Sequence, residues 1–333
     1  MSGEWRVANG EWRYYEGNSV KRDGNVYWKN TVSLGKNWNA FADVQVRNVD
    51  YRTKGTDNDL RSYDVDFNEM FFNPKAGVTF TGGKHKAYLS GAYAGKEPNR
   101  NDFVDVVDPS KVKSEYMFNA EAGYAFTAKD FTFHLNAYAM EYTNQLVVTG
   151  ALNDVGAPIR ANVPVSYRRG IELEAGVKLP LGFFAEGNVT RSINRVAEFT
   201  QISYDGEATF RNTPIAFSPD WMGAAQLGWS KKPSQVQWLK KLEFAWVSKY
   251  VGNQHMDNTG NHDLMLPAYW VQDLRGSVDF GWKKFPQFSG LDFWVNNVLN
   301  LEYVSNGYVY YGERYYYPQA PMNFMVAMRF KIF

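Results

Sequence analysis

Long stretches of this chain alternate between apolar and polar residues with a period of two. Between positions 116 and 126, the even positions carry Tyr, Phe or Ala, whereas Asn119 and Glu121 stand at odd positions. A helix with 3.6 residues per turn would scatter these two sets around its axis, so the pattern predicts β-strands with two different faces. The same alternation recurs in residues 38–47, 131–139 and 171–179.

About fourteen strands are predicted in this way, several of them longer than the roughly 5–6 residues common in globular sheets. Their lengths suit tilted strands that cross a membrane, which need roughly 9–11 residues. The predicted strands lie at 7–15, 26–34, 38–54, 71–81, 85–95, 114–127, 131–148, 162–179, 182–199, 215–230, 237–252, 268–282, 291–308 and 315–333.

The predicted connections alternate between short turns and long loops. Short turns at one end of the strands and long loops at the other are typical of outer-membrane barrels. The sequence therefore predicts an all-β fold, an antiparallel transmembrane β-barrel whose long loops lie outside the cell. The short turns fall at 35–37, 82–84, 128–130 and 180–181, and the long loops near 55–70, 96–113, 149–161, 200–214 and 253–267.

The composition also favours a membrane barrel over a soluble sheet. Aromatic residues make up 17% of the chain, and Trp and Tyr form belts at both interfaces of a membrane. The predicted polar faces are charged, as at Glu172 and Glu174, which suits a water-filled interior. No apolar run approaches the roughly 18 residues of a spanning helix. The net charge of +1 indicates no nucleic-acid partner, and with no cysteine neither disulfides nor thiolate zinc sites can form.

Several motifs follow one another along almost the whole chain in the order of one known family. Residues 72–77 read Phe-Asn-Pro-Lys-Ala-Gly, and residues 296–300 read Asn-Asn-Val-Leu-Asn shortly before a final strand that ends at Phe333. Together they resemble the C-terminal part of a TonB-dependent outer-membrane receptor, most like those of Bacteroidetes. The other matching stretches are 38–51, 92–102, 121–124, 142–147 and 166–172.

This resemblance implies a larger protein than the chain itself. Complete members of the family carry a signal peptide, a TonB box, a plug domain and a barrel of about 22 strands. Residues 1–6 do not form a secretory signal. We therefore expect residues 1–333 to be a single barrel domain, a fragment without the plug and without roughly the first eight strands. Phe333 is out of step with the outward positions 324–332, which leaves the register of the closing strand open.

The resemblance further implies transport into the cell. The parent protein would bind a small external ligand and admit it when the TonB complex acts on the plug. An iron chelate, either a siderophore or haem, is the expected ligand, with cobalamin and glycans as alternatives. The partners would be outer-membrane lipid, the TonB complex and that ligand. Two other readings stay open: a free-standing passive channel of about fourteen strands, and a soluble β-rich adhesin or lectin.

A tyrosine cluster is the first candidate site, and it falls in the last predicted external loop. Its rings could stack on an aromatic or anionic ligand, or they could belong to the external aromatic girdle of the barrel. The cluster consists of Tyr308, Tyr310, Tyr311, Arg314, Tyr315, Tyr316 and Tyr317.

Two further loops offer weak candidates for metal binding. His255, Asp257, His262 and Asp263 could supply nitrogen and oxygen ligands to a divalent metal. Residues 64–69 contain acidic and amide oxygens that could hold calcium, namely Asp64, Asp66, Asn68 and Glu69. No catalytic motif for hydrolysis, nucleotide binding or zinc proteolysis is present, so neither an enzyme nor a cofactor is expected.

Overall fold

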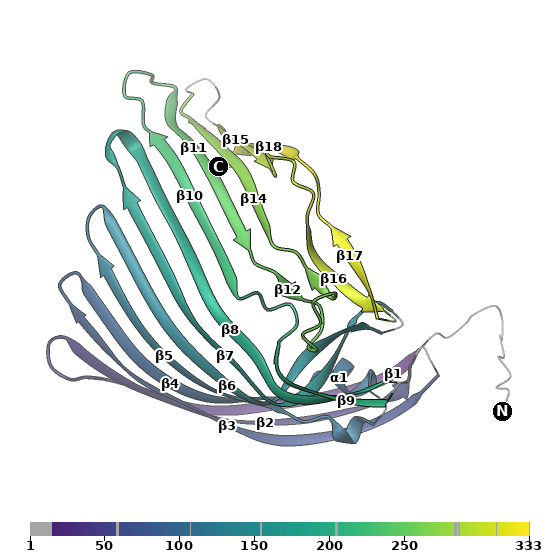
Figure 1. Cartoon of the computed structure of the whole chain (residues 1–333). Coiled ribbons are helices and arrows are strands. Elements are labelled where there is room, and N and C mark those ends of the chain that lie inside the picture. Colours follow the sequence, from purple (N-terminus) through teal and green to yellow (C-terminus); the bar gives the residue numbers. More distant parts are fainter. Residues whose placement is uncertain are drawn as a thin grey trace.

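The structure is a computed structural model that describes residues 15–57, 60–106, 108–153, 155–203, 206–282, 285, 287–310 and 312–332. It forms one strongly curved antiparallel sheet of 14 strands (Figure 1). No helix among these residues is long and apolar enough to cross a membrane. The strands of the sheet are β1 Glu16–Ser33, β2 Trp38–Thr56, β3 Ser62–Gly82, β4 His85–Lys96, β5 Glu115–Thr127, β6 Phe131–Leu152, β7 Pro158–Lys178, β8 Phe183–Ser203, β9 Gly206–Pro214, β10 Trp221–Lys231, β11 Leu239–Val251, β14 Tyr269–Phe280, β15 Phe288–Asn296 and β18 Asn323–Phe330.

The sheet follows the order of the chain, and each strand pairs with its neighbour in sequence except at three places. β9 pairs only with β8, so β10 takes the next place in the sheet. Two separate hairpins interrupt the order later: β12 (Gln254–His255) with β13 (Met265–Leu266), and β16 (Val304–Tyr310) with β17 (Glu313–Pro318). The remaining elements are one short helix, α1 (Arg100–Val104), and two 3₁₀ turns, η1 (Pro109–Lys111) and η2 (Pro180–Gly182). The predicted antiparallel β architecture is confirmed.

Within the described residues the sheet is an open arc, because β1 and β18 each pair with a single neighbour. Figure 1 shows the two edges separated across the concave side of the arc. A passive channel formed by this chain alone would require these two strands to pair with each other. The alternative reading, a free-standing closed barrel of about fourteen strands, is therefore not the arrangement found among the described residues.

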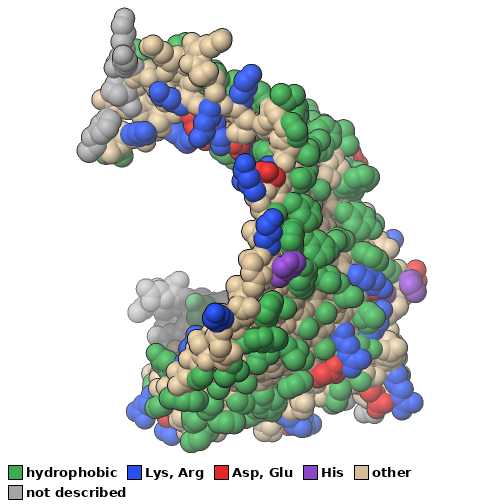
Figure 2. Space-filling view, turned by 90° about the vertical axis from the view of Figure 1, so that its left-hand side faces the viewer, with side chains coloured by type: hydrophobic (Ala, Val, Ile, Leu, Met, Phe, Trp, Pro, Cys, Tyr) green, Lys and Arg blue, Asp and Glu red, His purple; other side chains and the backbone are tan. Residues whose placement is uncertain are grey.

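The two faces of the sheet differ in chemistry, as the alternation predicts. In the β2–β3 ladder, Asp43 lies opposite Lys75 on the inner face, while Val46 lies opposite Phe72 on the outer face. Paired residues of an antiparallel ladder share a face, so the polar inner face and the apolar outer face each extend across several strands. Figure 2 shows hydrophobic side chains spread over the convex outer surface. Beyond Val46 the outward side chains of β2 become polar, beginning at Asn48, which marks the external end of the apolar band.

Part of the inner face is apolar and buried, which corrects the expectation of a polar lumen along its whole length. Near the external end, Val49, Val65 and Phe71 are buried together with Phe103 from α1. Residues 97–106 and 108–113, which fall in the predicted external loop 96–113, therefore fold back onto the inner side of the sheet. We call residues 97–106 and 108–113 the inner segment. It buries apolar rings that would otherwise face water, which stabilises this end of the arc.

Hydrogen bonds and ion pairs tie the start of the inner segment to the first two strands. The Glu97 carboxylate accepts bonds from the Arg47 guanidinium at 2.8 Å and from the Lys21 ammonium at 2.7 Å. Burial alone would raise the pKa of Glu97, but the bonds from Arg47 and Lys21 outweigh it and lower the pKa to about 2. The charged carboxylate is therefore the form that the fold favours.

This lowered pKa predicts a loss of order in the inner segment at acidic pH. A carboxyl whose folded pKa is depressed stabilises the fold fully above its ordinary pKa of 4.5, and that stabilisation disappears as the pH falls toward about 2. Hydrogen exchange of residues 97–106 should therefore accelerate between these two values. Glu97→Gln should exchange faster already at neutral pH and respond less to acid. Asp66→Asn, in an exposed outer ion pair, is the control and should leave the acid response of the segment unchanged.

Several predicted strand limits are wrong, and the reasons are local. The predicted strand 291–308 ends at Asn296, because Asn297 and Asn300 adopt positive φ values of 52° and 51° and turn the chain. The Asn297 side chain closes this turn by accepting a hydrogen bond from the Leu301 amide at 2.9 Å. Other strands run into predicted loops, and β3 starts at Ser62. The predicted strand 7–15 lies almost wholly outside the described residues, and Phe333 lies outside them as well.

Candidate ligand-binding site at the external end of the sheet

Two small hairpins stand together at the long-loop end of the sheet, on its inner side (Figure 1). The Tyr316 hydroxyl donates to the Met265 carbonyl at 3.3 Å, and the Arg314 guanidinium donates to the Asp263 carbonyl at 3.0 Å. These bonds join β16–β17 to the loop that carries β12–β13. The approach is close at Gly307, where an added Cβ would lie 2.8 Å from Met256 and 2.3 Å from a backbone oxygen. Glycine is therefore required for this contact.

The loop with β12–β13 is anchored to the wall of the sheet by Asn258. This side chain is 5% exposed. Its amide donates to the Val148 carbonyl on β6 at 2.8 Å and accepts from the Ala216 amide at 2.8 Å. A buried amide that satisfies two backbone groups in this way fixes the position of the loop. The sequence analysis missed Asn258, because nothing in a polar loop distinguishes this asparagine from its neighbours.

The predicted tyrosine cluster is divided between the two faces of the β16–β17 hairpin. Tyr308 lies opposite Tyr315, and their rings stack at 5.0 Å with an interplanar angle of 10°. The rings of Tyr317 and Tyr310 lie 5.7 Å from Tyr308 and 6.5 Å from Tyr315, respectively. We call these four residues the tyrosine ladder.

The remaining members of the predicted cluster lie elsewhere. Arg314 and Tyr316 face the other hairpin, with the Arg314 guanidinium 5.8 Å from the Tyr316 ring. The predicted pairing of Arg314 with the stacked rings is therefore not seen. Tyr311 lies outside the described residues. The ladder thus presents rings and phenolic hydroxyls, without the cation that the sequence analysis placed beside it.

A cleft of about 680 Å³ lies between this hairpin and the external ends of β6 and β7. Tyr317 and Asn306, which pair across the hairpin, form one wall. Phe217 and Gln254 contribute side chains from two other segments, and much of the remaining lining is backbone of small residues around Gly150. Among the described residues that line the cleft, none carries a charge. Phe217, Gln254 and Asn306 were not predicted, because only the fold brings their segments together.

The predicted metal ligands in the 253–267 loop do not converge. The His255 and His262 rings meet edge to face at 5.7 Å, but the buried Asp257 carboxylate accepts hydrogen bonds from the amide and hydroxyl of Thr259. Burial raises the pKa of Asp257 and lowers the pKa of His255, which disfavours the charged form of both. Asp263 is exposed. In the described part of the chain, no group of three or more His, Asp or Glu side chains could hold a metal.

The predicted calcium ligands are separated by the strand that contains them. Residues 64–69 belong to β3 rather than to a loop, so successive side chains point to opposite faces. Asp64 and Asp66 point outward and pair with Lys54 at 3.0 Å and Arg52 at 3.4 Å. Asn68 lies on that same outer face. Glu69 points inward, where it accepts hydrogen bonds from Ser114 and Tyr116.

The chain matches the family model described as "TonB dependent receptor-like, beta-barrel" over residues 2–298. No curated protein sequence matches it. Similar solved structures include the siderophore receptor PiuA from Acinetobacter baumannii, with a TM-score of 0.73 and 14% identity over 94% of this chain and 44% of PiuA. The ferric yersiniabactin uptake receptor FyuA from Yersinia pestis has a TM-score of 0.71 and 15% identity, over 95% of this chain and 46% of FyuA.

The copper transporter OprC gives a TM-score of 0.70 and 12% identity, over 94% of this chain and 48% of OprC. The chain thus spans about half the length of these three proteins. At such low identity the likeness shows the fold alone, and the three are described as receptors or transporters rather than enzymes. The family match covers most of the chain and agrees with the curved antiparallel sheet and its apolar outer surface. The chain belongs to the TonB-dependent receptor-like β-barrel family of the outer membrane.

Proposed function

We propose that the protein carrying this chain is a TonB-dependent importer and that its cargo is an iron chelate, either a siderophore or haem. Residues 1–333 would form part of the barrel, as a single domain, and the TonB complex would act through a plug domain. The family match supports the transport class. The descriptions of PiuA and FyuA support an iron chelate, whereas OprC is described as a copper transporter. The fold therefore does not distinguish an iron chelate from another cargo, and the lining of the site is the remaining guide.

The observation that carries this proposal is the external cleft, with Tyr317 of the tyrosine ladder at its wall. A volume of about 680 Å³ lies within the range of pockets that enclose small molecules. Tyr317 and Phe217 offer ring surfaces to a bulky organic ligand, and Asn306 and Gln254 offer amide donors and acceptors to its polar atoms. Such a lining suits a chelate that surrounds its metal with organic groups better than a bare metal ion.

Growth on single nutrient sources tests the cargo. A host that lacks this locus should lose growth on at least one ferric chelate or on haem as the sole iron source. Its growth on cobalamin and on glycans should be unchanged, and restoring the full-length gene should restore growth on the chelate. Unchanged uptake of every iron source would refute the iron assignment, and selective loss on cobalamin or a glycan would reassign the cargo.

Replacing Tyr317 by alanine should weaken ligand binding. Loss of a stacked ring at the wall of the cleft should raise the Kd for the identified chelate by about tenfold, which corresponds to about 1.4 kcal/mol. Binding to whole cells with a labelled chelate is the measurement. Tyr310→Ala is the matched control, because this ring belongs to the same tyrosine ladder but does not line the cleft. Equal effects of both substitutions would indicate general damage to the hairpin and would count against a ligand contact at Tyr317.

A further inference from the structure

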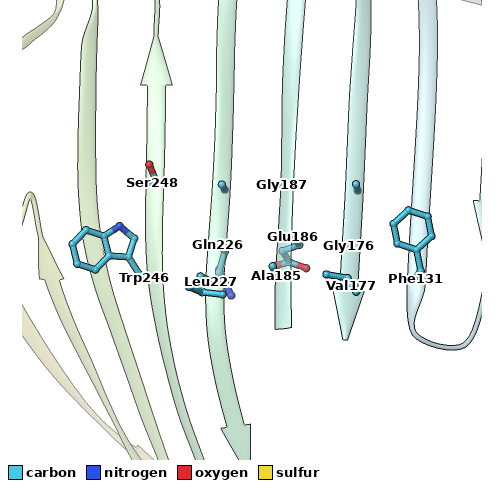
Figure 3. A pocket seen from close by; sticks show the side chains of 12 residues that line it. Phe131, Gly176, Val177, Ala185, Glu186, Gly187, Gln226, Leu227, Trp246 and Ser248 are labelled. Carbon is cyan, nitrogen blue, oxygen red and sulfur yellow. The ribbon is translucent and has the colours of Figure 1, made fainter. Parts of the chain in front are cut away.

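A hollow crosses the outer surface of the sheet at the level of four small residues. Ala175, Gly187, Ala225 and Ser248 are successive cross-strand partners on β7, β8, β10 and β11. They line a groove of about 420 Å³. Larger side chains border it, and Figure 3 shows Phe131, Val177, Leu227 and Trp246 along its rim. Because these positions belong to the outward set, the groove opens toward the hydrocarbon of the membrane.

Two arginines stand on the same outer face of β8, toward the external end. Arg191 and Arg195 follow Gly187 at intervals of four residues, and the buried Ser192 and Asn194 between them point inward. At about 3.4 Å per residue, Arg191 lies about 14 Å from Gly187 of the groove along the strand. Its guanidinium lies 5.3 Å from the ring of Trp221. Tryptophan and arginine together mark the headgroup level of a membrane.

The charge of this arginine pair is only partly neutralised. Both guanidiniums approach the same carboxylate, Asp220, at 3.1 Å from Arg191 and 3.6 Å from Arg195. The neighbouring Arg169 has its own partner, Glu141, at 2.7 Å. The side chains of Arg191 and Arg195 are 42% and 25% exposed, so they remain accessible from outside. Among the described side chains, these two cations share one anion, which leaves one positive charge at the membrane surface.

Another outward arginine stands in a group whose charges balance. Arg52 on β2 approaches two carboxylates, Asp50 at 3.6 Å and Asp66 at 3.4 Å, and Asp50 is shared with Arg22 at 3.7 Å. The excess positive charge is thus a property of the β8 face rather than of outward arginines in general. Arg52 therefore provides a control that matches the pair in residue type and in its outward position.

We propose that the outer face of β7, β8 and β10 binds a phosphorylated lipid of the outer leaflet. The lipid phosphate lies between Arg191 and Arg195, and an acyl chain descends into the groove at Gly187 and Ala225. Arginine suits this role because its planar guanidinium bonds two phosphate oxygens at once. The distance from the arginine pair to the groove fits a lipid chain that runs parallel to the strands. This site lies outside the barrel and is independent of the cargo.

The test uses the full-length receptor, purified from outer membranes in mild detergent and examined by native mass spectrometry after addition of diphosphoryl lipid A. We expect Arg191→Ala/Arg195→Ala to reduce the lipid-bound fraction by about tenfold. Arg52→Ala should leave it unchanged. Only protein that shows the heat-modifiable migration of a folded barrel is compared, so a failure to fold is not counted as a loss of binding. Equal lipid retention by the double variant and the unaltered receptor would overturn the proposal.

Two further binding measurements distinguish recognition of the lipid phosphate from binding of the acyl chain in the groove. Dephosphorylated lipid A should bind the unaltered receptor about tenfold more weakly if the phosphate is recognised. Ala225→Phe fills the groove with a side chain that tolerates lipid contact, and it should reduce binding while leaving the arginine pair intact. Displacement of the lipid by inorganic phosphate alone would show an anion site without a lipid and would overturn the proposal. Binding that is insensitive to Ala225→Phe would overturn the assignment of the acyl chain to the groove.

Discussion

Replacing Leu173 with arginine is expected to destabilise the membrane-inserted receptor by about 2–4 kcal/mol. Leu173 lies on the outer face of β7, between Leu135 of β6 and Val189 of β8. Three apolar residues in a row, Leu135, Leu173 and Val189, place this position within the hydrocarbon band, where a guanidinium would lose its hydration. Reversible unfolding by guanidinium chloride in lipid vesicles measures the effect.

Glu174→Arg is the control. Residue 174 follows Leu173 in the strand, so its side chain points to the inner face, where it lies opposite His134. There the new charge stays hydrated, so we expect a change of less than about 1 kcal/mol. If both variants unfolded at the same denaturant concentration, the assignment of the two faces to lipid and water would be wrong.

Asp102→Ala is expected to release the inner segment and to cost about 3 kcal/mol, the lower end of the range for breaking a buried ion pair. Asp102 is 3% exposed and receives two bonds from Arg160, at 2.7 and 2.6 Å. It also closes the capping box of α1 with Asn99. The substitution would leave the Arg160 guanidinium without its carboxylate and expose the apolar cluster around Phe103. Hydrogen exchange of residues 97–106 should accelerate by about two orders of magnitude.

Asp108→Ala serves as the comparison in the same segment. Asp108 is half-exposed and caps η1 through Ser110, so we expect its substitution to cost about 1 kcal/mol of stability. Its substitution should leave the exchange of α1 nearly unchanged. Slow exchange of α1 in Asp102→Ala would mean that the apolar contacts of Phe103 hold the segment without the ion pair.

The alternation of residues predicted the fold because it depends only on neighbouring positions. Val46 and Arg47 fall on opposite faces in any strand that contains them, whatever the rest of the chain does. The strand limits were harder, because polar residues that extend a strand beyond the membrane resemble loop residues. Residues 62–70 are an example: Asp64 and Asp66 follow the alternation, but their composition suggested a loop.

The site could be predicted only in part, because its geometry depends on register and on distant contacts. The sequence singled out Tyr308 and Tyr315, but only the hairpin register shows that they stack and that Arg314 lies on the other face. The cleft needs segments that lie more than 100 positions apart, such as Val148 and Asn258, which are 110 residues apart and joined by one hydrogen bond. No periodicity in the sequence records such a pair.

The anchoring of Asn258 has a mechanical consequence. One side chain holds the tip of β6 and the segment before β10, while its own loop carries the hairpin that contacts β16–β17. A displacement of the tyrosine ladder would therefore strain both hydrogen bonds of this amide before the loop could move alone. The external mouth and the barrel wall beneath it are therefore coupled, and the two hydrogen bonds of Asn258 resist their separation together with the bond from the Phe217 amide to the His255 carbonyl at 2.8 Å.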